Sequence, residues 1–195
     1  MPYEAKKFEQ LLGLAGFSDQ LLKNHFTLYE GYVANTNKVV DFLGSKDPAS
    51  LEFSEAKRRF GWEWNGMRLH ELYFENLTQN YQGLDNASEL NKKIIEKFES
   101  VEKWAAVFKS IGMMRGIGWV VLYYDAEEGK LFNIWISEHD GGHLAGATPL
   151  LIMDVFEHAY MLDYQLKKAD YIESFLKSIN WSVVNDRLVR VMRME

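Results

Sequence analysis

Residues 154–160 read Asp-Val-Phe-Glu-His-Ala-Tyr and place a carboxylate and an imidazole four residues apart among bulky apolar neighbours. On a helix, Asp154 and His158 would share a face, because four residues make about one turn. A strand would also serve, since residues 150–153 after Pro149 are typical of a short buried strand that Asp154 would close before a helix carrying His158. Either geometry indicates a metal site. The alternative is an ordinary solvent-exposed pair.

The composition narrows the class of protein. With 195 residues, 47% of them hydrophobic, the chain can bury a substantial core as one domain or two small ones. Its net charge of −6 differs from the basic stripe of nucleic-acid-binding proteins, so we expect no nucleic-acid partner. The absence of cysteine excludes disulfides and thiolate metal sites and suits a reducing cytoplasm. Without a signal core or a membrane-spanning run, the protein is expected to be soluble, cytoplasmic and free of a membrane partner.

The first part of the chain predicts a long helix. Ser18 is a good N-cap, and apolar residues then recur at helical spacing over residues 20–42 without a proline. His25 falls on the apolar face of this helix. A loop is expected at residues 44–50.

A second helix is expected after this loop, capped by Ser54 and carrying His70 among aromatic residues. The polar, turn-rich segment 79–86 then provides a boundary. We therefore expect a helical-hairpin domain at residues 1–84 and an α/β domain at residues 85–195.

The second domain begins with a helix capped by Ser88, broken near Ser100 and ended by Gly112. Runs rich in β-branched and aromatic residues then predict three strands, at 116–124, 131–137 and 150–153. Three helices close the chain, at about 156–166, 170–179 and 182 to the end. The predicted fold class is α+β: an N-terminal long helical hairpin plus a C-terminal α/β domain with a small three-stranded antiparallel sheet flanked by helices.

The histidines are the strongest candidates for chemistry: His25, His70, His139, His143 and His158. One partly buried histidine is usually a structural residue, but three in apolar surroundings with an inward-facing Asp154 form a plausible ligand set. Three imidazoles and a carboxylate without thiolate suit iron, manganese or zinc. The chain contains no Glu-x-x-His pair, G-x-S-x-G elbow or H-E-x-x-H motif, which excludes the enzyme classes built on them.

Residues 154–160 resemble the D-x-W-E-H-A-Y signature of iron/manganese superoxide dismutases, and residues 162–165 and 170–172 resemble its downstream helix. Further matches follow the family's order over almost the whole chain: His25 with Tyr32, Val33 and Asn35; His70 with Tyr73 and Phe74; Gly116 to Trp119; and Asn180 with Trp181.

Several positions depart from the family. The spacing from His25 to Tyr32 is one residue shorter than in most members, so we expect that helix to lack a bulge. Phe156 replaces the usual tryptophan. The family's outer-sphere glutamine is absent from both of its usual places. Gly66 occupies one of these places, and His139 occupies the other.

The resemblance implies a superoxide dismutase that converts superoxide to O2 and H2O2 at one iron or manganese ion per chain, with iron favoured and manganese tolerated. The implied metal ligands are His25, His70, Asp154 and His158. His139 would hydrogen-bond the solvent on the metal, with His143 as the alternative, and Tyr32 would be its gatekeeping neighbour. Ile152 would tune the pocket two residues before Asp154.

The resemblance also implies a homodimer, with a tetramer as the alternative, in which Glu157 of one chain reaches His158 of the other. Tyr160 belongs to the same implied catalytic set. Two other functions stay open from the residues alone: another mononuclear non-haem metalloenzyme, or a metal-free structural or interaction protein whose histidines are core residues.

Overall fold

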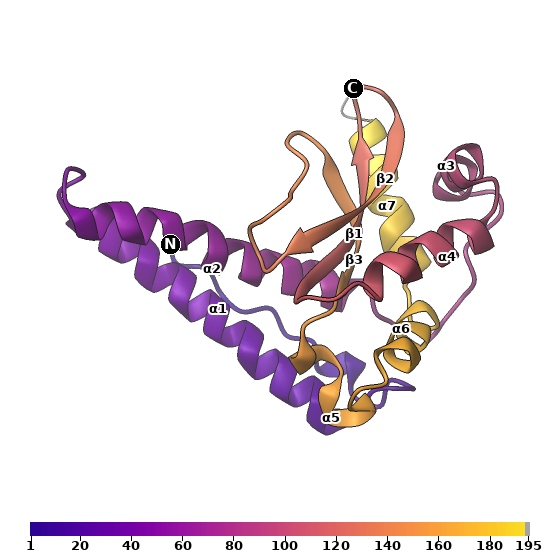
Figure 1. Ribbon diagram of the computed structural model, residues 1–195, viewed down its shortest axis with the longest axis horizontal. Coiled ribbons are helices and arrows are strands. Elements are labelled where there is room, and N and C mark those ends of the chain that lie inside the picture. The colour runs from indigo at the N-terminus through magenta and orange to yellow at the C-terminus, as the bar shows by residue number, and fades with distance from the viewer. Residues whose placement is uncertain (194–195) are drawn as a thin grey trace.

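The structure is a computed structural model that describes residues 1–193, and it has two parts (Figure 1). Two long antiparallel helices, α1 (Asp19–Ser45) and α2 (Leu51–Glu75), form the N-terminal hairpin. A three-stranded sheet with shorter helices around it forms the rest. The predicted α+β class is confirmed.

The helix caps explain where the hairpin begins and turns. The Ser18 side chain accepts a hydrogen bond from the Leu21 N–H and starts α1, as predicted. The expectation that Ser54 caps α2 is wrong, because Ser50 accepts from the Phe53 N–H one turn earlier. A tight turn in which the Ser50 N–H donates to the Asp47 carbonyl brings Ser50 into the capping position.

The next helix pair also follows its caps. Ser88 starts α3 (Glu89–Phe98), and Ser100 starts α4 (Val101–Gly112). Between them Glu99 has a φ of 70°, a left-handed conformation that ends the first helix. The predicted break near Ser100 and the end at Gly112 are confirmed.

The sheet has the order β2-β1-β3, and both pairings are antiparallel. Its strands are β1 (Gly118–Asp125), β2 (Lys130–Ser137) and β3 (Thr148–Asp154). Gly118 begins the central strand with a φ of 151°, and a Cβ there would lie 1.9 Å from the Ile136 carbonyl oxygen, so only glycine fits. The register places Trp119 opposite Asp154, at the end of β3.

The segment after β3 differs from the expectation. The predicted helix over residues 156–166 is wrong: the chain forms a 3-10 turn η2 (Glu157–Ala159) and the short helix α5 (Met161–Tyr164). The Asp154 side chain accepts from the Phe156 N–H, which makes a turn instead of a helix start, and Gln165 has a φ of 51°, which ends α5.

Two further helices follow, α6 (Lys168–Leu176) and α7 (Trp181–Met192). The last helix was expected to reach the chain end, where residues 194 and 195 lie outside the described residues. In Figure 1 the long hairpin runs along one side of the sheet, while α3, α4 and α6 lie on the other side. Within residues 1–193, no helix is long and apolar enough to cross a membrane.

The two parts are joined by buried polar contacts as well as by apolar packing. The Arg187 guanidinium of α7 donates to Asn76 Oδ1 (2.6 Å), the Leu150 carbonyl (2.7 Å), the Leu72 carbonyl (3.2 Å) and Glu75 (2.9 Å). These bonds tie the end of α2 to β3 through α7.

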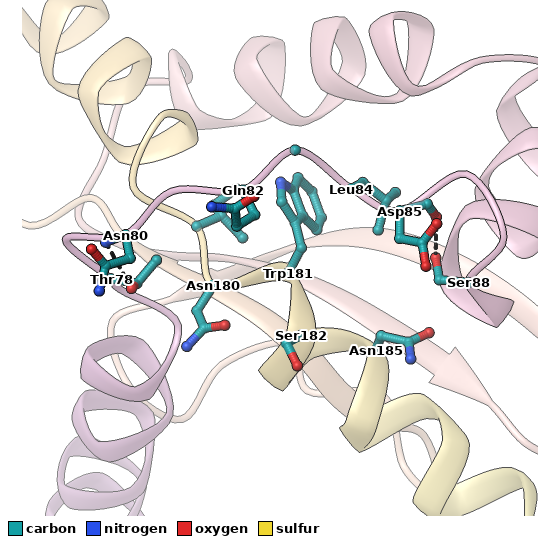
Figure 2. Close-up of a pocket in the computed structure, with 12 residues that line it drawn as sticks. Thr78, Asn80, Gln82, Leu84, Asp85, Ser88, Asn180, Trp181, Ser182 and Asn185 are labelled. Atoms are coloured by element: carbon teal, nitrogen blue, oxygen red, sulfur yellow. Dashed lines mark hydrogen bonds between the residues drawn. The ribbon is translucent and has the colours of Figure 1, made fainter.

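The connecting segment between the two parts passes over Trp181 at the start of α7 (Figure 2). A cavity of about 240 Å³ lies there, and none of the predicted site residues lines it. The predicted division after residue 84 falls in this segment and stays a prediction.

Candidate metal centre

Four elements bring the four predicted ligands together. His25 comes from α1, His70 from α2, Asp154 from the end of β3 and His158 from η2. One potential ligand atom from each residue lies within 4.8 Å of those of the others. His25 and Asp154 are 129 positions apart in the sequence, so only the folded chain assembles the cluster.

The Asp154 carboxylate lies at the middle of this cluster. Its Oδ2 is 3.2 Å from His25 Nε2 and 3.0 Å from His158 Nε2. His70 Nε2 is farther, at 3.7 Å from Oδ2, and this buried nitrogen has no hydrogen-bond partner among the described residues. All three rings therefore present Nε2 to one point.

Other bonds leave these ligand atoms free. His70 Nδ1–H donates to the Gly66 carbonyl at 2.6 Å, so the lone pair on Nε2 faces the cluster. Asp154 Oδ1 accepts from the Phe156 N–H, which leaves Oδ2 for the cluster. The Tyr171 hydroxyl donates to the Asp154 carbonyl at 2.6 Å and holds the backbone in place.

Burial sets the protonation of the cluster. It lowers the pKa of His25 and lowers that of His70 well below the usual value, so both rings are neutral near pH 7. Burial alone would raise the pKa of Asp154, but the neighbouring His158 and His25 outweigh it and hold that pKa well below its usual range. Three imidazoles, of which His25 and His70 are held neutral by burial, and one carboxylate are a donor set for a divalent or trivalent metal.

His139 lies next to the cluster. Although its loop is polar, its side chain is fully buried, and its ring centroid is 6.1 Å from that of His70. Trp119 Nε1–H donates to His139 Nδ1 at 3.1 Å. Because an indole nitrogen only donates, His139 carries its proton on Nε2 and donates to the Tyr32 hydroxyl oxygen, 2.7 Å away. Burial lowers the pKa of His139 to about 4, which keeps it neutral.

The chain is similar to known proteins over most of its length. Residues 86–187 match the family described as iron/manganese superoxide dismutases, C-terminal domain. The chain is 36% identical to an iron superoxide dismutase of Cupriavidus metallidurans over 186 residues, which cover 92% of each chain. It is 34% identical to an iron superoxide dismutase of Aquifex pyrophilus, covering 92% of this chain and 88% of that one. A manganese superoxide dismutase of Haloferax volcanii is 31% identical, with 93% and 89% covered.

The chain belongs to the iron/manganese superoxide dismutase family. The resemblance drawn from its motifs is confirmed. The relatives include proteins named for iron and proteins named for manganese.

The structure separates the two loop histidines. His143 Nε2–H donates to the His139 carbonyl at 2.9 Å, and His143 Nδ1 accepts from the Tyr123 hydroxyl at 2.8 Å. Both nitrogens are thus engaged away from the ligand cluster. Of the two histidines, His139 is the one that lies beside the centre of this superoxide dismutase.

The remaining predicted site residues surround the cluster. Ile152 is fully buried and lies two positions before Asp154 on the same face of β3. Tyr160 stacks on Tyr171 with ring centroids 5.5 Å apart. Glu157 is exposed, and within residues 1–193 it has no hydrogen-bond partner on its side chain.

Sequence reasoning did not identify Trp62 as a neighbour of the site. Its ring centroid lies 4.7 Å from that of His139, nearly perpendicular to it. Packing requires a glycine at the nearby position 66, because a Cβ there would lie 2.5 Å from the Tyr32 ring. The sequence signal that could have identified Trp62 is the helical spacing of residues 62, 66 and 70, which places all three on one face of α2 with the candidate ligand His70.

Proposed function

We propose that the chain is a superoxide dismutase and that His25, His70, Asp154 and His158 hold one iron or manganese ion. The observation that carries this proposal is the buried cluster of four ligand atoms in a member of this family. The orphaned Nε2 of His70 supports it, because a buried polar atom without a partner is costly unless a ligand satisfies it. A cation would also compensate the buried charge of Asp154.

A bound iron or manganese ion supplies a one-electron couple, by which one superoxide is oxidised to O2 and the next is reduced to H2O2 with two protons. The chain supplies the proton-holding groups. Since His139 donates to the Tyr32 oxygen, the Tyr32 hydroxyl proton is left free to be donated elsewhere. Burial raises the pKa of Tyr32 to about 12, so the hydroxyl keeps this proton at neutral pH.

The aromatic residues around the cluster exclude water and favour a small substrate. Trp119 fixes the tautomer of His139 through Nδ1, and Phe156 stacks on His139 with centroids 4.8 Å apart. An organic substrate needs an open pocket, whereas these rings fill the space beside the ligands. This crowding favours dismutation over another mononuclear metalloenzyme activity.

We further propose iron as the favoured metal, with manganese tolerated. An imidazole N–H at position 139 is a less firm donor than a glutamine amide, and outer hydrogen bonds tune the potential of a metal. Three relatives that are 36%, 34% and 33% identical to this chain are named as iron enzymes, which supports this preference.

We also propose a homodimer, with a tetramer as the alternative, in which Glu157 accepts from Nδ1 of His158 in the partner chain. His158 is 27% exposed in the single chain, and a ligating imidazole needs an acceptor for its second nitrogen. The proposed location is the cytoplasm, because a chain without cysteine does not depend on disulfides, which a reducing compartment would break.

The test is a dismutation assay on iron-loaded and manganese-loaded protein side by side, with metal content measured on the same samples. Activity with one ion per chain, greater with iron, is expected. A purified protein that binds no metal would favour the metal-free alternative. A protein that binds metal but leaves superoxide untouched would favour a different metalloenzyme. Full activity of a monomer at micromolar concentration would refute the role of Glu157.

A further inference from the structure

A crevice of about 260 Å³ lies between α1 and α2 and reaches Tyr32. Tyr32 and residues of the adjacent turns of α1 form one wall, and Arg59, Trp62 and Glu63 of α2 form the other. The crevice is open to solvent, and one of its lining residues, Tyr32, bonds His139 through its hydroxyl.

The inner end of this crevice adjoins the proposed catalytic groups. Tyr32 Oη lies 2.7 Å from His139 Nε2, and the Tyr32 ring stacks on the His70 ring at 5.2 Å. Trp62 packs against His139 from the opposite wall. An anion in the crevice thus lies beside Tyr32, which in turn contacts His139 and His70.

Two contacts position Arg59 in the wall of the crevice. Its Nε–H donates to Glu63 Oε1 at 2.8 Å, and its guanidinium carbon lies 5.0 Å from the centre of the Trp62 ring. The Arg59 side chain is 56% exposed, whereas that of Glu63 is 5% exposed. In the described part of the chain, the terminal guanidinium nitrogens of Arg59 have no hydrogen-bond partner.

The charge of Arg59 acts on both proton-holding groups. Burial raises the pKa of Tyr32 and lowers that of His139, and in each case the positive charge of Arg59 contributes a lowering. The guanidinium is therefore within electrostatic reach of the inner end of the crevice.

We propose that Arg59 is the steering residue of this crevice: it draws the anionic substrate toward Tyr32, while Glu63 holds the guanidinium in place and limits its pull. This inference rests on the proposed function. The chain as a whole carries a net charge of −6 and repels superoxide, so a fixed local cation has a large effect on the encounter rate. Lys168, by contrast, donates its ammonium to the Met114 carbonyl at 2.8 Å and does not line this crevice.

The test compares three single charge changes. Arg59→Gln removes the cation of the crevice, and Glu63→Gln removes its carboxylate while keeping an oxygen for Arg59. Arg58→Gln is the matched control, because it makes the same charge change one residue away, where Arg58 is 77% exposed and pairs with Glu55. The rate constant kcat/KM for superoxide is measured as a function of ionic strength.

At about 10 mM ionic strength, Arg59→Gln should lower kcat/KM about three-fold, and the loss should shrink as salt is raised to about 0.5 M. Glu63→Gln should raise kcat/KM, and Arg58→Gln should leave it near the parent value. Equal effects of Arg59→Gln and Arg58→Gln at low salt would overturn the proposal.

A second measurement does not depend on activity. Quenching of Trp62 fluorescence, obtained by subtracting the signal of Trp62→Phe protein, is recorded with iodide and with neutral acrylamide. If Arg59 concentrates anions, Arg59→Gln weakens quenching by iodide but not by acrylamide. If the parent protein has no dismutase activity, the proposed function is refuted. If the parent protein is active but Arg59→Gln leaves quenching by iodide unchanged, the steering role alone is refuted.

Discussion

Replacing His70 by alanine tests the ligand cluster most directly. His70 supplies one of four candidate ligand atoms, and its Nε2 has no other partner within the described residues. Loss of groups that only support ligands costs about 10- to 100-fold in metal affinity, so loss of a ligand itself should cost at least about 1,000-fold. At a metal concentration of about 1,000 times the parent dissociation constant, metal stabilises the parent by about 4 kcal/mol. In the variant this increment should fall below about 0.5 kcal/mol.

The assay is denaturant unfolding with and without metal, together with metal content after gel filtration. The increment due to metal is compared, rather than the total stability, because truncating a buried ring also leaves a cavity. His143→Ala is the matched control, since both nitrogens of His143 bond elsewhere and its metal increment should remain. If His70→Ala protein keeps one metal per chain and the full increment, the four-ligand assignment is refuted.

Three further outcomes are expected. His139→Ala should lower activity with each metal, and unchanged activity with both would remove His139 from the site. Arg187→Met should reduce the free energy of unfolding by about 3 kcal/mol, because it leaves buried acceptors unsatisfied; a loss below about 1 kcal/mol in urea would contradict this. Metal-free protein should lose stability as pH falls from about 6.5 toward 4, because burial lowers the pKa of His139 to about 4 while the unfolded chain binds the proton near 6.5. Unfolding at pH 7, 5.5 and 4.5 measures this slope, and a flat profile would refute it.

Local signals in the sequence predicted most of the elements, because they act over a few residues. Ser18 and Ser88 cap helices where their patterns indicated, Ser100 lies at the predicted break, and the β-branched runs form the three strands. The error at Ser54 arose because two serines compete four residues apart, and only the turn at Asp47 decides between them.

Contacts between distant segments could not be predicted in the same way. Residues 138–143 are polar and indicate an exposed loop, yet His139 is fully buried because Trp119 and Tyr32 bind its two nitrogens. The broken helix after β3 has a similar origin, since Asp154 bonds the Phe156 N–H while it also faces the cluster. Both features depend on pairings that no local pattern contains.

The position of Tyr32 explains why the loop, rather than α2, provides the outer hydrogen bond here. Seven residues separate His25 from Tyr32 on an unbroken α1, so both side chains face α2. The Tyr32 ring then occupies the space above position 66, where even a Cβ would approach it to 2.5 Å. A longer side chain from α2 at this point would displace Tyr32. The group that bonds Tyr32 must therefore come from the opposite direction, and the loop after β2 places His139 there, with Trp119 orienting its ring. The continuous helix between His25 and Tyr32, the glycine at 66 and the histidine at 139 thus belong to one packing arrangement.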